Sequence, residues 1–567
     1  MARKQRKQSA GKTEERGVRQ AILWTAIAGL VVICSACGLV YWAVRQASGV
    51  RLPLGREPVT LQVAYSPEKG ELFKALVAGF NGSKAQTGDG RPIRVEAQEL
   101  TPERMIQAAA GGEFHAISPD SSIWLDVLDR AWMEEQETEV GLVGETVRYA
   151  VSPVVLAMWE DVAHQMGYPQ RALGWEDLLV KAQSDPNFRW SHPSTSSASG
   201  LLATLAEFYA GVGKTRGLTE EDAQAQATLD YVGALEKTVR YYGEGEWAVV
   251  QQALSEGRAY LEAFVCQEQL VVYFNQRSSD RLVAIYPREG TLWEDHPLAL
   301  LELSDLSSDA RQAFGLFRDF LLSEASQRQI LAAGYRPADL SIPLDSPDSP
   351  LTLANGVDPT QPQTTLQIPS PSVVEVVRDV WWYTKRHTNV YLVVDTSGSM
   401  RGEKLDNVQV ALGAFLGSIK GDQERVGLID FSHEIKQFLF LDELGSNRGE
   451  LESAIAGLEA QGNTALLDAI ATAYVRLQDM EDPERINAIV AMTDGLENAS
   501  NIELGELAER IRAGNQQGVP VVIFCIAYGS DADFKTLQAI ADASGGQVRS
   551  GDVTTIEELY KILSTYF

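Results

Sequence analysis

The pentapeptide Asp-Thr-Ser-Gly-Ser at residues 395–399 constrains this chain more than any other feature, because it directly follows the apolar run at 390–394. A strand that ends in this way presents one carboxylate, Asp395, and two hydroxyls, Ser397 and Ser399, from a single tight turn. Hard oxygen groups of this kind are the ligands that Mg²⁺ prefers, at about 2.0–2.1 Å in octahedral geometry. The pattern predicts a metal site at the carboxyl end of a buried strand.

Two later segments supply matching oxygen groups. Thr464 stands just before a helical stretch at 465–478, and Asp494 follows a second apolar run at 488–492. In a parallel sheet with helices outside, the carboxyl ends of the strands lie along one edge, where ligands bind. We therefore expect both residues to join the first three. The alternative is a turn in which Asp395 caps the next helix and the hydroxyls only satisfy backbone groups.

The five positions resemble the metal-ion-dependent adhesion site (MIDAS) of the von Willebrand factor type A (VWA) domain. The resemblance covers roughly residues 386–567, about one third of the chain, and departs from the motif at none of the five: Asp395, Ser397, Ser399, Thr464 and Asp494. It implies a Rossmann-like domain with a mostly parallel sheet. It also implies a bound Mg²⁺, with Mn²⁺ or Ca²⁺ as alternatives, whose coordination is completed by a carboxylate of a protein partner, as in cell adhesion.

The sequence after the motif alternates between helix and strand. Apolar residues recur at helical spacing in some stretches and form short continuous runs in others. Strands that alternate with helices favour a parallel sheet. The expected helices and strands lie, in chain order, at residues 403–418, 425–431, 434–440, 519–527, 533–543 and 555–566.

The N-terminal region predicts a membrane anchor. Residues 21–44 contain no charged side chain over 24 positions, which as a helix of about 36 Å is enough to cross a hydrocarbon core of about 30 Å. Residues 1–20 hold seven basic and two acidic side chains, and positive charge favours the cytoplasmic side. We expect a basic cytoplasmic tail at 1–20, a single transmembrane helix at 21–44 in the cell membrane, and the bulk of the chain outside. A cleaved signal peptide is the competing interpretation.

The composition agrees with a soluble extracytoplasmic part. The chain has 49 basic and 77 acidic residues, a net charge of −28, which disfavours nucleic acid and anionic lipid as partners. Only Cys266 and Cys525 lie outside the membrane segment, each within an apolar run. We expect two buried thiols instead of a disulfide framework.

Residues 57–342 form a second predicted globular unit, with strand-to-helix turns that carry hydroxyl groups. Segments at 59–68, 116–124, 282–297 and 334–337 resemble the extracellular solute-binding proteins of ABC importers, the type 2 periplasmic binding proteins. The resemblance covers about half of the chain and is carried by less specific motifs than the metal site. It implies two α/β lobes with a ligand cleft between them and a hinge that the chain crosses.

Hydroxyl groups at predicted helix starts are the candidate ligand contacts, because free N–H groups and the helix dipole attract anions there. Ordinary helix caps are an equally good interpretation of these serines. Glu68 and Asp120 stand beside the turns and count against a small oxyanion. The candidate ligand-binding residues are Ser66, Ser118, Ser121, Ser122, Ser196, Ser197 and, on the hinge side, Tyr273.

A proline-rich linker at residues 343–372 separates the two units. Seven prolines fall between positions 340 and 372, and no apolar period persists, which predicts an extended, semi-rigid spacer. The unit at 373–567 then opens with a short helix at 373–385 that is expected to dock onto the metal domain. Alternatively, its tryptophans Trp381 and Trp382 contact the binding-protein lobe.

No constellation in the sequence builds a nucleophile with its base. The segment 211–215 echoes a phosphate loop, but the first glycine of that motif would fall at Phe208 and a helix precedes it instead of a strand. Neither His-Glu-x-x-His nor Gly-x-Ser-x-Gly occurs, and no cysteine pair has zinc spacing outside the membrane segment. The sequence predicts a protein that is not an enzyme.

Three functional interpretations follow. The first is a membrane-anchored binding protein whose metal grips an acidic group of a protein partner, while the solute-binding-like unit senses or presents a ligand. The second is an anchored substrate-binding component of an ABC transport system, with the VWA unit as an assembly module. The third, a chaperone-like partner of an AAA+ ATPase, conflicts with the predicted extracytoplasmic location.

Overall fold

The computed structural model describes residues 58–243, 245–552, 555–556, 560 and 563. The predicted cytoplasmic tail at 1–20 and transmembrane helix at 21–44 lie outside these residues. Within the described part of the chain, no helix is both long and apolar enough to cross a membrane.

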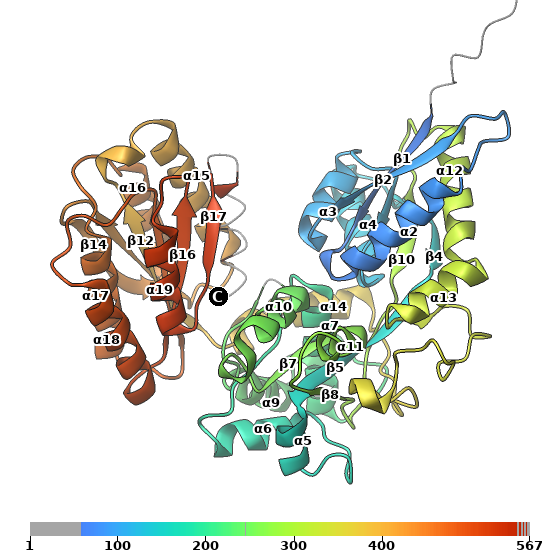
Figure 1. Ribbon diagram of the computed structural model, residues 1–567, viewed down its shortest axis with the longest axis horizontal. Coiled ribbons are helices and arrows are strands. Elements are labelled where there is room, and N and C mark those ends of the chain that lie inside the picture. The colour runs from blue at the N-terminus through green and yellow to red at the C-terminus, as the bar shows by residue number, and fades with distance from the viewer. Residues whose placement is uncertain (1–57, 244, 553–554, 557–559, 561–562, 564–567) are drawn as a thin grey trace, which may run out of the picture. The chain divides into compact units, whose positions relative to one another are not determined.

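The first sheet is mixed and has five strands (Figure 1). Its order is β2 (Ile93–Glu99), β1 (Val59–Tyr65), β3 (Ala116–Ser118), β10 (Pro297–Leu301) and β4 (Val143–Arg148). Strands β1 and β3 run parallel, whereas β10 is antiparallel to both β3 and β4.

Helices on both faces bury this sheet. On one face, buried side chains of α3 (Pro102–Ala110) and α4 (Ile123–Glu135) form an apolar cluster with Ala64, Ile117 and Leu301. Another contact is aromatic: Phe73 and Phe80 of α2 (Gly70–Gly82) pack edge-on against Phe317 of α12 (Ser308–Leu321). The last helix of this region is α13 (Glu324–Ala332).

The second sheet is built around one long buried strand, β5 (Ala150–Trp159). The strand order is β11 (Arg336–Pro337), β5, β7 (Ala263–Gln267) and β6 (Trp190–Ser191), with β8 (Leu282–Ile285) and β9 (Trp293–Glu294) also paired to β5. The helices of this region are α5 (Glu160–Gln165), α6 (Trp175–Ser184), α7 (Ala198–Val212), α8 (Glu220–Gln224), α9 (Gln226–Glu236), α10 (Glu246–Glu256) and α11 (Glu268–Asn275).

Two extended segments run from one sheet into the other. Strand β4 continues into β5 after Tyr149, and β9 continues into β10 through His296. The segments pair with each other on both sides of this point, Pro297 with Arg148 and Glu294 with Ser152. The predicted two α/β lobes with a chain crossing between them are therefore present.

The third sheet has the order β14, β13, β12, β15, β16 and β17, with β14 as an antiparallel edge strand and the other five parallel. Its central strands are buried on both faces, as their continuous apolar runs predict. The strands are β12 (Thr388–Asp395), β13 (Arg425–Phe431), β14 (Ile435–Glu443), β15 (Ile486–Thr493), β16 (Val521–Tyr528) and β17 (Val548–Gly551).

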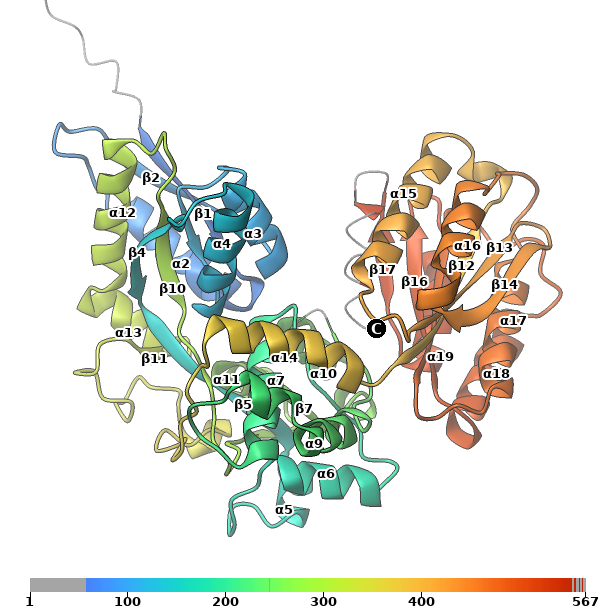
Figure 2. The same cartoon turned by 180° about the vertical axis from the view of Figure 1, so that it is seen from behind.

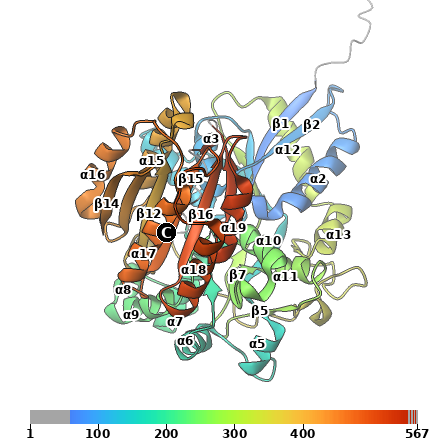
Figure 3. The same cartoon turned by 60° about the vertical axis from the view of Figure 1, so that its left-hand side comes forward.

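Helices cover both faces of this sheet (Figures 2 and 3). Val390 and Leu392 of β12 belong to the cluster that includes α15 (Glu403–Ser418) and α16 (Leu444–Ala456). Tyr391 and Val393 point the other way, as the two-residue period of a strand requires. They join the cluster that includes α17 (Leu466–Asp479), α18 (Leu504–Gln517) and α19 (Phe534–Ser544). The helix predicted at 555–566 falls mostly outside the described residues.

The segment predicted as a semi-rigid spacer at 343–372 is instead, up to residue 370, a strap bound to the second lobe. Its Leu351, Val357 and Leu366 are buried. Leu366 N donates to Thr291 O at 3.0 Å, and Thr291 N donates to Thr364 O at 3.0 Å. The expectation failed because isolated apolar residues without a period can still fill separate pockets.

Gly356 shows how closely this strap approaches the lobe. Its φ of 79° lies in the left-handed region, and an added Cβ would meet Leu282 O at 2.2 Å. Only glycine avoids both the strain and the clash. Its carbonyl accepts a hydrogen bond of 2.8 Å from Ala284 N in β8.

Helix α14 (Pro371–Thr384) docks on the solute-binding-like region, so its expected docking on the metal domain is wrong and the alternative is confirmed. The indole Nε1 of Trp381 donates to Glu236 Oε1 at 2.7 Å, and its ring lies 5.1 Å from that of Tyr242. Trp381 is buried, as are Val373 and Val377 on the same face. The apolar face of α14 packs against a surface formed by α7, α8 and α9.

Candidate functional site

The first candidate site begins where β12 ends. Asp395 is the last residue of the strand and is fully buried, and Ser397 and Ser399 follow in a single 3₁₀ turn. Ser397 N donates to Asp395 Oδ1 at 2.7 Å, and the Thr493 hydroxyl donates to Asp395 Oδ2. These bonds hold the carboxylate at the sheet edge with both oxygens oriented.

The other predicted oxygen groups reach the same place. Ser397 Oγ lies 3.0 Å from Ser399 Oγ, which donates to Asp494 Oδ1 at 2.6 Å. A methyl group added to Gly495 would lie 3.4 Å from Thr464 Oγ1 and 3.6 Å from Ser399 Oγ, so these two hydroxyls face one spot. All five predicted residues therefore converge, which the helix-cap alternative does not explain.

The position of Thr464 depends on the loop after β15. Its N–H donates to Asn498 Oδ1 at 3.1 Å, and its carbonyl accepts from the backbone of Asn498 and Ala499 at 3.1 Å. These bonds tie the start of α17 to the segment that follows Asp494.

The electrostatics of the site favour a bound cation. Asp395 and Asp494 are both 0% exposed. The pKa of Asp395 is raised to about 6, chiefly by burial and also by the nearby Asp494, although Thr493 and Ser397 oppose the shift by hydrogen bonding. The Lys404 ammonium pairs with Asp494 Oδ2 and so balances one of the two charges. Two buried carboxylates and three hydroxyls are an oxygen donor set that fits Mg²⁺ or Mn²⁺.

The predicted ligand serines of the N-terminal region separate into two groups. Ser66 and Ser118 are buried together beside Asp120: Ser66 Oγ accepts from Asp120 N at 3.1 Å, and Ser118 Oγ donates to Pro297 O at 2.8 Å. The other four belong to local turns and helix starts. Ser121 Oγ accepts from Ile123 N, Ser122 precedes α4, Ser196 Oγ contacts Ser194 Oγ, and Ser197 caps α7 by accepting from Gly200 N.

A buried lysine lies next to the first group and was not predicted from the sequence. Lys69 Nζ lies 3.2 Å from Asp120 Oδ1 and donates to Pro119 O at 2.6 Å and to Ser118 Oγ at 3.3 Å. Burial alone would raise the pKa of Asp120, but the Lys69 charge and His296 outweigh burial and hold it below its ordinary value.

Tyr273, expected on the hinge side, lies on α11. It lines a pocket of about 240 Å³ together with Glu68, Trp247, Gln269 and Tyr335. Its ring centroid is 4.9 Å from that of Trp247. The pocket thus joins residues of both lobes.

Family comparisons agree with this division of the chain. Residues 389–562 match the model of the von Willebrand factor type A domain, and residues 61–336 match that of a bacterial extracellular solute-binding protein.

Individual relatives cover one part each. Inter-alpha-trypsin inhibitor heavy chain H4 of Sus scrofa is 29% identical over 185 residues, 30% of this chain and 20% of that protein. The chain thus spans about a fifth of the length of such curated relatives. The sulfate-binding protein SubI from Mycobacterium tuberculosis is 19% identical, covers 50% of this chain and 88% of its own, and has a TM-score of 0.36. A von Willebrand factor type A structure from Catenulispora acidiphila is 23% identical over 32% of this chain and 43% of its own, with a TM-score of 0.28.

Proposed function

We propose, because this chain joins a solute-binding-protein domain at 61–336 to a VWA domain at 389–562, that it is an anchored extracytoplasmic binding protein with two recognition sites. The VWA domain binds a divalent metal and through it an acidic group of a protein partner. The solute-binding domain senses or presents a small ligand. No step requires catalysis, and both domain families are of a binding type.

One observation carries the VWA part of the proposal: five oxygen-bearing side chains from three separate segments meet at one edge of the sheet. Ser399 Oγ donates to Asp494 Oδ1 at 2.6 Å and so connects the first segment to the third. The hydroxyls of Thr464 and Ser399 both face the position that a Cβ on Gly495 would take. A divalent ion, when bound, supplies positive charge and an open coordination position that a partner's carboxylate can fill. Asp395, Ser397, Ser399, Thr464 and Asp494 would hold it.

The surrounding residues prepare the site for this role. The Thr493 hydroxyl and the Ser397 amide orient the two oxygens of Asp395 before any ion binds. Lys404 pairs with the buried Asp494 and so offers it a partner of opposite charge. An arriving divalent cation would replace the ammonium as the partner of Asp494.

The test is a calorimetric titration of the full chain with Mg²⁺ and with Mn²⁺. The unchanged chain should bind Mg²⁺, and Asp494→Ala should weaken Mg²⁺ binding by more than the roughly 10–100-fold that loss of an outer-shell partner costs. Asp442→Asn, an exposed carboxylate on β14, is the control and should bind as the parent does. Failure of the unchanged chain to bind either ion would contradict metal-mediated recognition.

A second candidate function is the substrate-binding component of an ABC transport system. The observation that favours it is the pocket of about 240 Å³ lined from both lobes. An importer component should stimulate ATP hydrolysis by a cognate membrane transporter when its solute is present. A pure recognition protein should leave that ATPase rate unchanged, so co-reconstitution with the transporter separates the two functions.

A further inference from the structure

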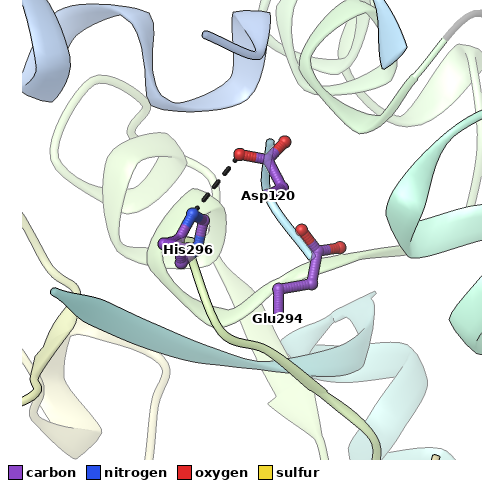
Figure 4. Close-up of side chains that lie close together, drawn as sticks. All are labelled: Asp120, Glu294 and His296. Carbon is purple, nitrogen blue, oxygen red and sulfur yellow. Dashed lines mark ion pairs between the residues drawn. The ribbon is translucent and has the colours of Figure 1, made fainter. Parts of the chain in front are cut away.

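Three ligating side chains meet where the chain crosses between the two lobes of the solute-binding domain. Asp120, Glu294 and His296 each offer one atom, and these atoms all lie within 4.8 Å of one another (Figure 4). Asp120 is 2% exposed, and the other two are 0% exposed. Donors bonded at about 2.1 Å to one ion lie at most about 4.2 Å apart, so only small side-chain movements would bring these atoms onto a common ion.

The segments that cross between the lobes place these three side chains close together. Asp120 lies in the turn after β3, Glu294 ends β9, and His296 directly precedes β10. His296 has a φ of 34°, an uncommon and strained conformation for a residue with a Cβ. Its N–H donates to Asp120 O at 2.8 Å. Strain of this kind persists where the surroundings enforce it, often at ligand sites.

Glu294 has no partner within the described structure. Both of its carboxylate oxygens are buried and neither accepts a hydrogen bond. Asp120 Oδ1 likewise accepts none, and its contacts are the Lys69 ammonium at 3.2 Å and His296 Nδ1 at 3.3 Å. A buried carboxylate left without a partner is costly, and a bound cation removes that cost.

Four acidic side chains crowd together around the cluster. Besides Asp120 and Glu294, these are the buried Glu246, whose oxygens accept from Gln267, and Glu68 on the wall of the pocket. Among the described residues, the Lys69 ammonium pairs with Asp120. Carboxyl groups crowded in this way disfavour a bound oxyanion, whereas a divalent cation relieves their mutual repulsion.

The hydrogen bonds of His296 decide which nitrogen is available. Nε2 lies 2.8 Å from Gln267 Oε1, which also accepts from Gln269 Nε2 at 2.8 Å. Since Gln267 Oε1 accepts both bonds, Nε2 carries the proton and Nδ1 is the nitrogen that faces the carboxylates. An outer partner that fixes the tautomer in this way is typical of a metal-ligating histidine.

We propose that this cluster binds a first-row divalent cation such as Mn²⁺ or Zn²⁺ through His296 Nδ1 and the carboxylates of Asp120 and Glu294. One imidazole with two carboxylates is a donor set that suits these ions. The inference rests on the proposed solute-binding role and specifies its ligand class. The pocket lies next to the cluster, because Tyr335, which lines it, packs edge-on against His296 with ring centroids 5.1 Å apart.

Lys69 distinguishes a cation from the competing class, a small anion. Its ammonium lies beside Asp120 Oδ1 and would repel a metal ion but attract an oxyanion. Lys69→Met should therefore tighten metal binding. Loss of ligand binding in that variant, together with binding of sulfate or phosphate by the parent, would overturn the proposal.

The experiment uses the full chain carrying Asp494→Ala, so that the VWA site does not contribute. Mn²⁺ and Zn²⁺ are titrated separately by calorimetry, and bound Mn²⁺ is followed by electron paramagnetic resonance. The expected result is one bound ion, with affinity reduced at least about 10-fold by Glu294→Gln. Glu207→Gln tests the other buried group of ligating side chains, His192, Glu207 and Glu236, and should leave the affinity unchanged.

The outcomes separate this inference from the proposed function. If the Asp494→Ala chain binds neither ion, or if Glu294→Gln and Glu207→Gln weaken binding equally, the cluster is not the site. Binding of Mg²⁺ by the unmutated chain at the VWA domain would then leave the proposed function standing. If a solute other than a metal binds and Glu294→Gln does not affect it, the ligand class is wrong while the solute-binding role survives.

Discussion

At the scale of single residues, Glu424 is the charge on which the start of the VWA domain depends. It is fully buried just before β13. Lys385 Nζ contacts its Oε1 at 2.8 Å, and Thr388 donates to its Oε2 through both N–H and Oγ1 at 2.6 Å. Burial alone would raise the pKa of Glu424, but Lys385, His387 and Thr388 together lower it to about 2.

This pKa predicts how stability depends on pH. The folded-state pKa is below the ordinary value of 4.5, so the stabilisation is present above pH 4.5 and is lost as the pH falls toward 2. The shift corresponds to on the order of 3 kcal/mol. Glu424→Gln should therefore lower the free energy of unfolding by about that amount at pH 7, and by much less near pH 3. Chemical unfolding of the VWA domain at both pH values measures the difference.

The control for this substitution is Glu450→Gln, an exposed carboxylate on α16. Its effect should stay within about 0.5 kcal/mol at either pH. A Glu424→Gln effect of the same size at both pH values would show that the lost stability is due to packing and not to the ionised carboxylate.

At the scale of elements, α14 is the helix that completes the solute-binding domain. Glu236, at the end of α9, accepts from the Trp381 indole at 2.7 Å and from Tyr242 OH at 2.6 Å, and it pairs with His192 Nε2 at 3.2 Å. All four side chains are buried. Helix α14 therefore covers the Glu236 carboxylate and supplies one of its three partners.

Trp381→Phe tests this contact, because it keeps an aromatic ring and removes the N–H donor. A hydrogen bond to a charged group contributes about 1.5–3 kcal/mol, so the midpoint of thermal unfolding of the solute-binding domain should fall measurably. Trp382→Phe, at a neighbouring and only partly buried position, should have the smaller effect. Equal shifts for the two variants would show that the indole N–H is not what holds the helix.

The strands and the metal motif of the VWA domain were predictable from the sequence because their signals are local. A continuous apolar run followed by Asp395-x-Ser-x-Ser gives both a buried strand and its sheet edge. Where α14 docks was not predictable, since its apolar face fits any complementary surface. The cluster of Glu294 and His296 with Asp120 was not predicted from the sequence for another reason. Asp120 is more than 170 positions away, so the three residues form no short motif.

At the scale of the whole molecule, each domain buries one free cysteine in a central strand. Cys266 lies in β7 and Cys525 in β16. Burial raises the pKa of both thiols, that of Cys525 to about 12. Neither thiol is accessible or ionised in the folded chain, so each reports when its own domain opens.

Thiol labelling can therefore follow the two domains separately. In a chain carrying Cys34→Ser and Cys37→Ser, Ellman's reagent should leave Cys266 and Cys525 unmodified until the protein unfolds. Mg²⁺ at 100 times its Kd should slow labelling of Cys525 up to about 100-fold where labelling follows unfolding. It should leave Cys266 unaffected, and Asp494→Ala should abolish the effect. Rapid labelling of either thiol in the native chain would contradict the prediction.

The docked helix α14 also decides where one evolutionary module ends and the next begins. By composition the natural cut falls at the prolines near 343, yet the strap and α14 are structurally part of the preceding domain. A recombination event or a truncation at the prolines would remove the strap and α14 from the second lobe and expose Glu236. An exchangeable unit must extend through Thr384, so that a VWA domain can be swapped only as the piece that begins after the last turn of α14.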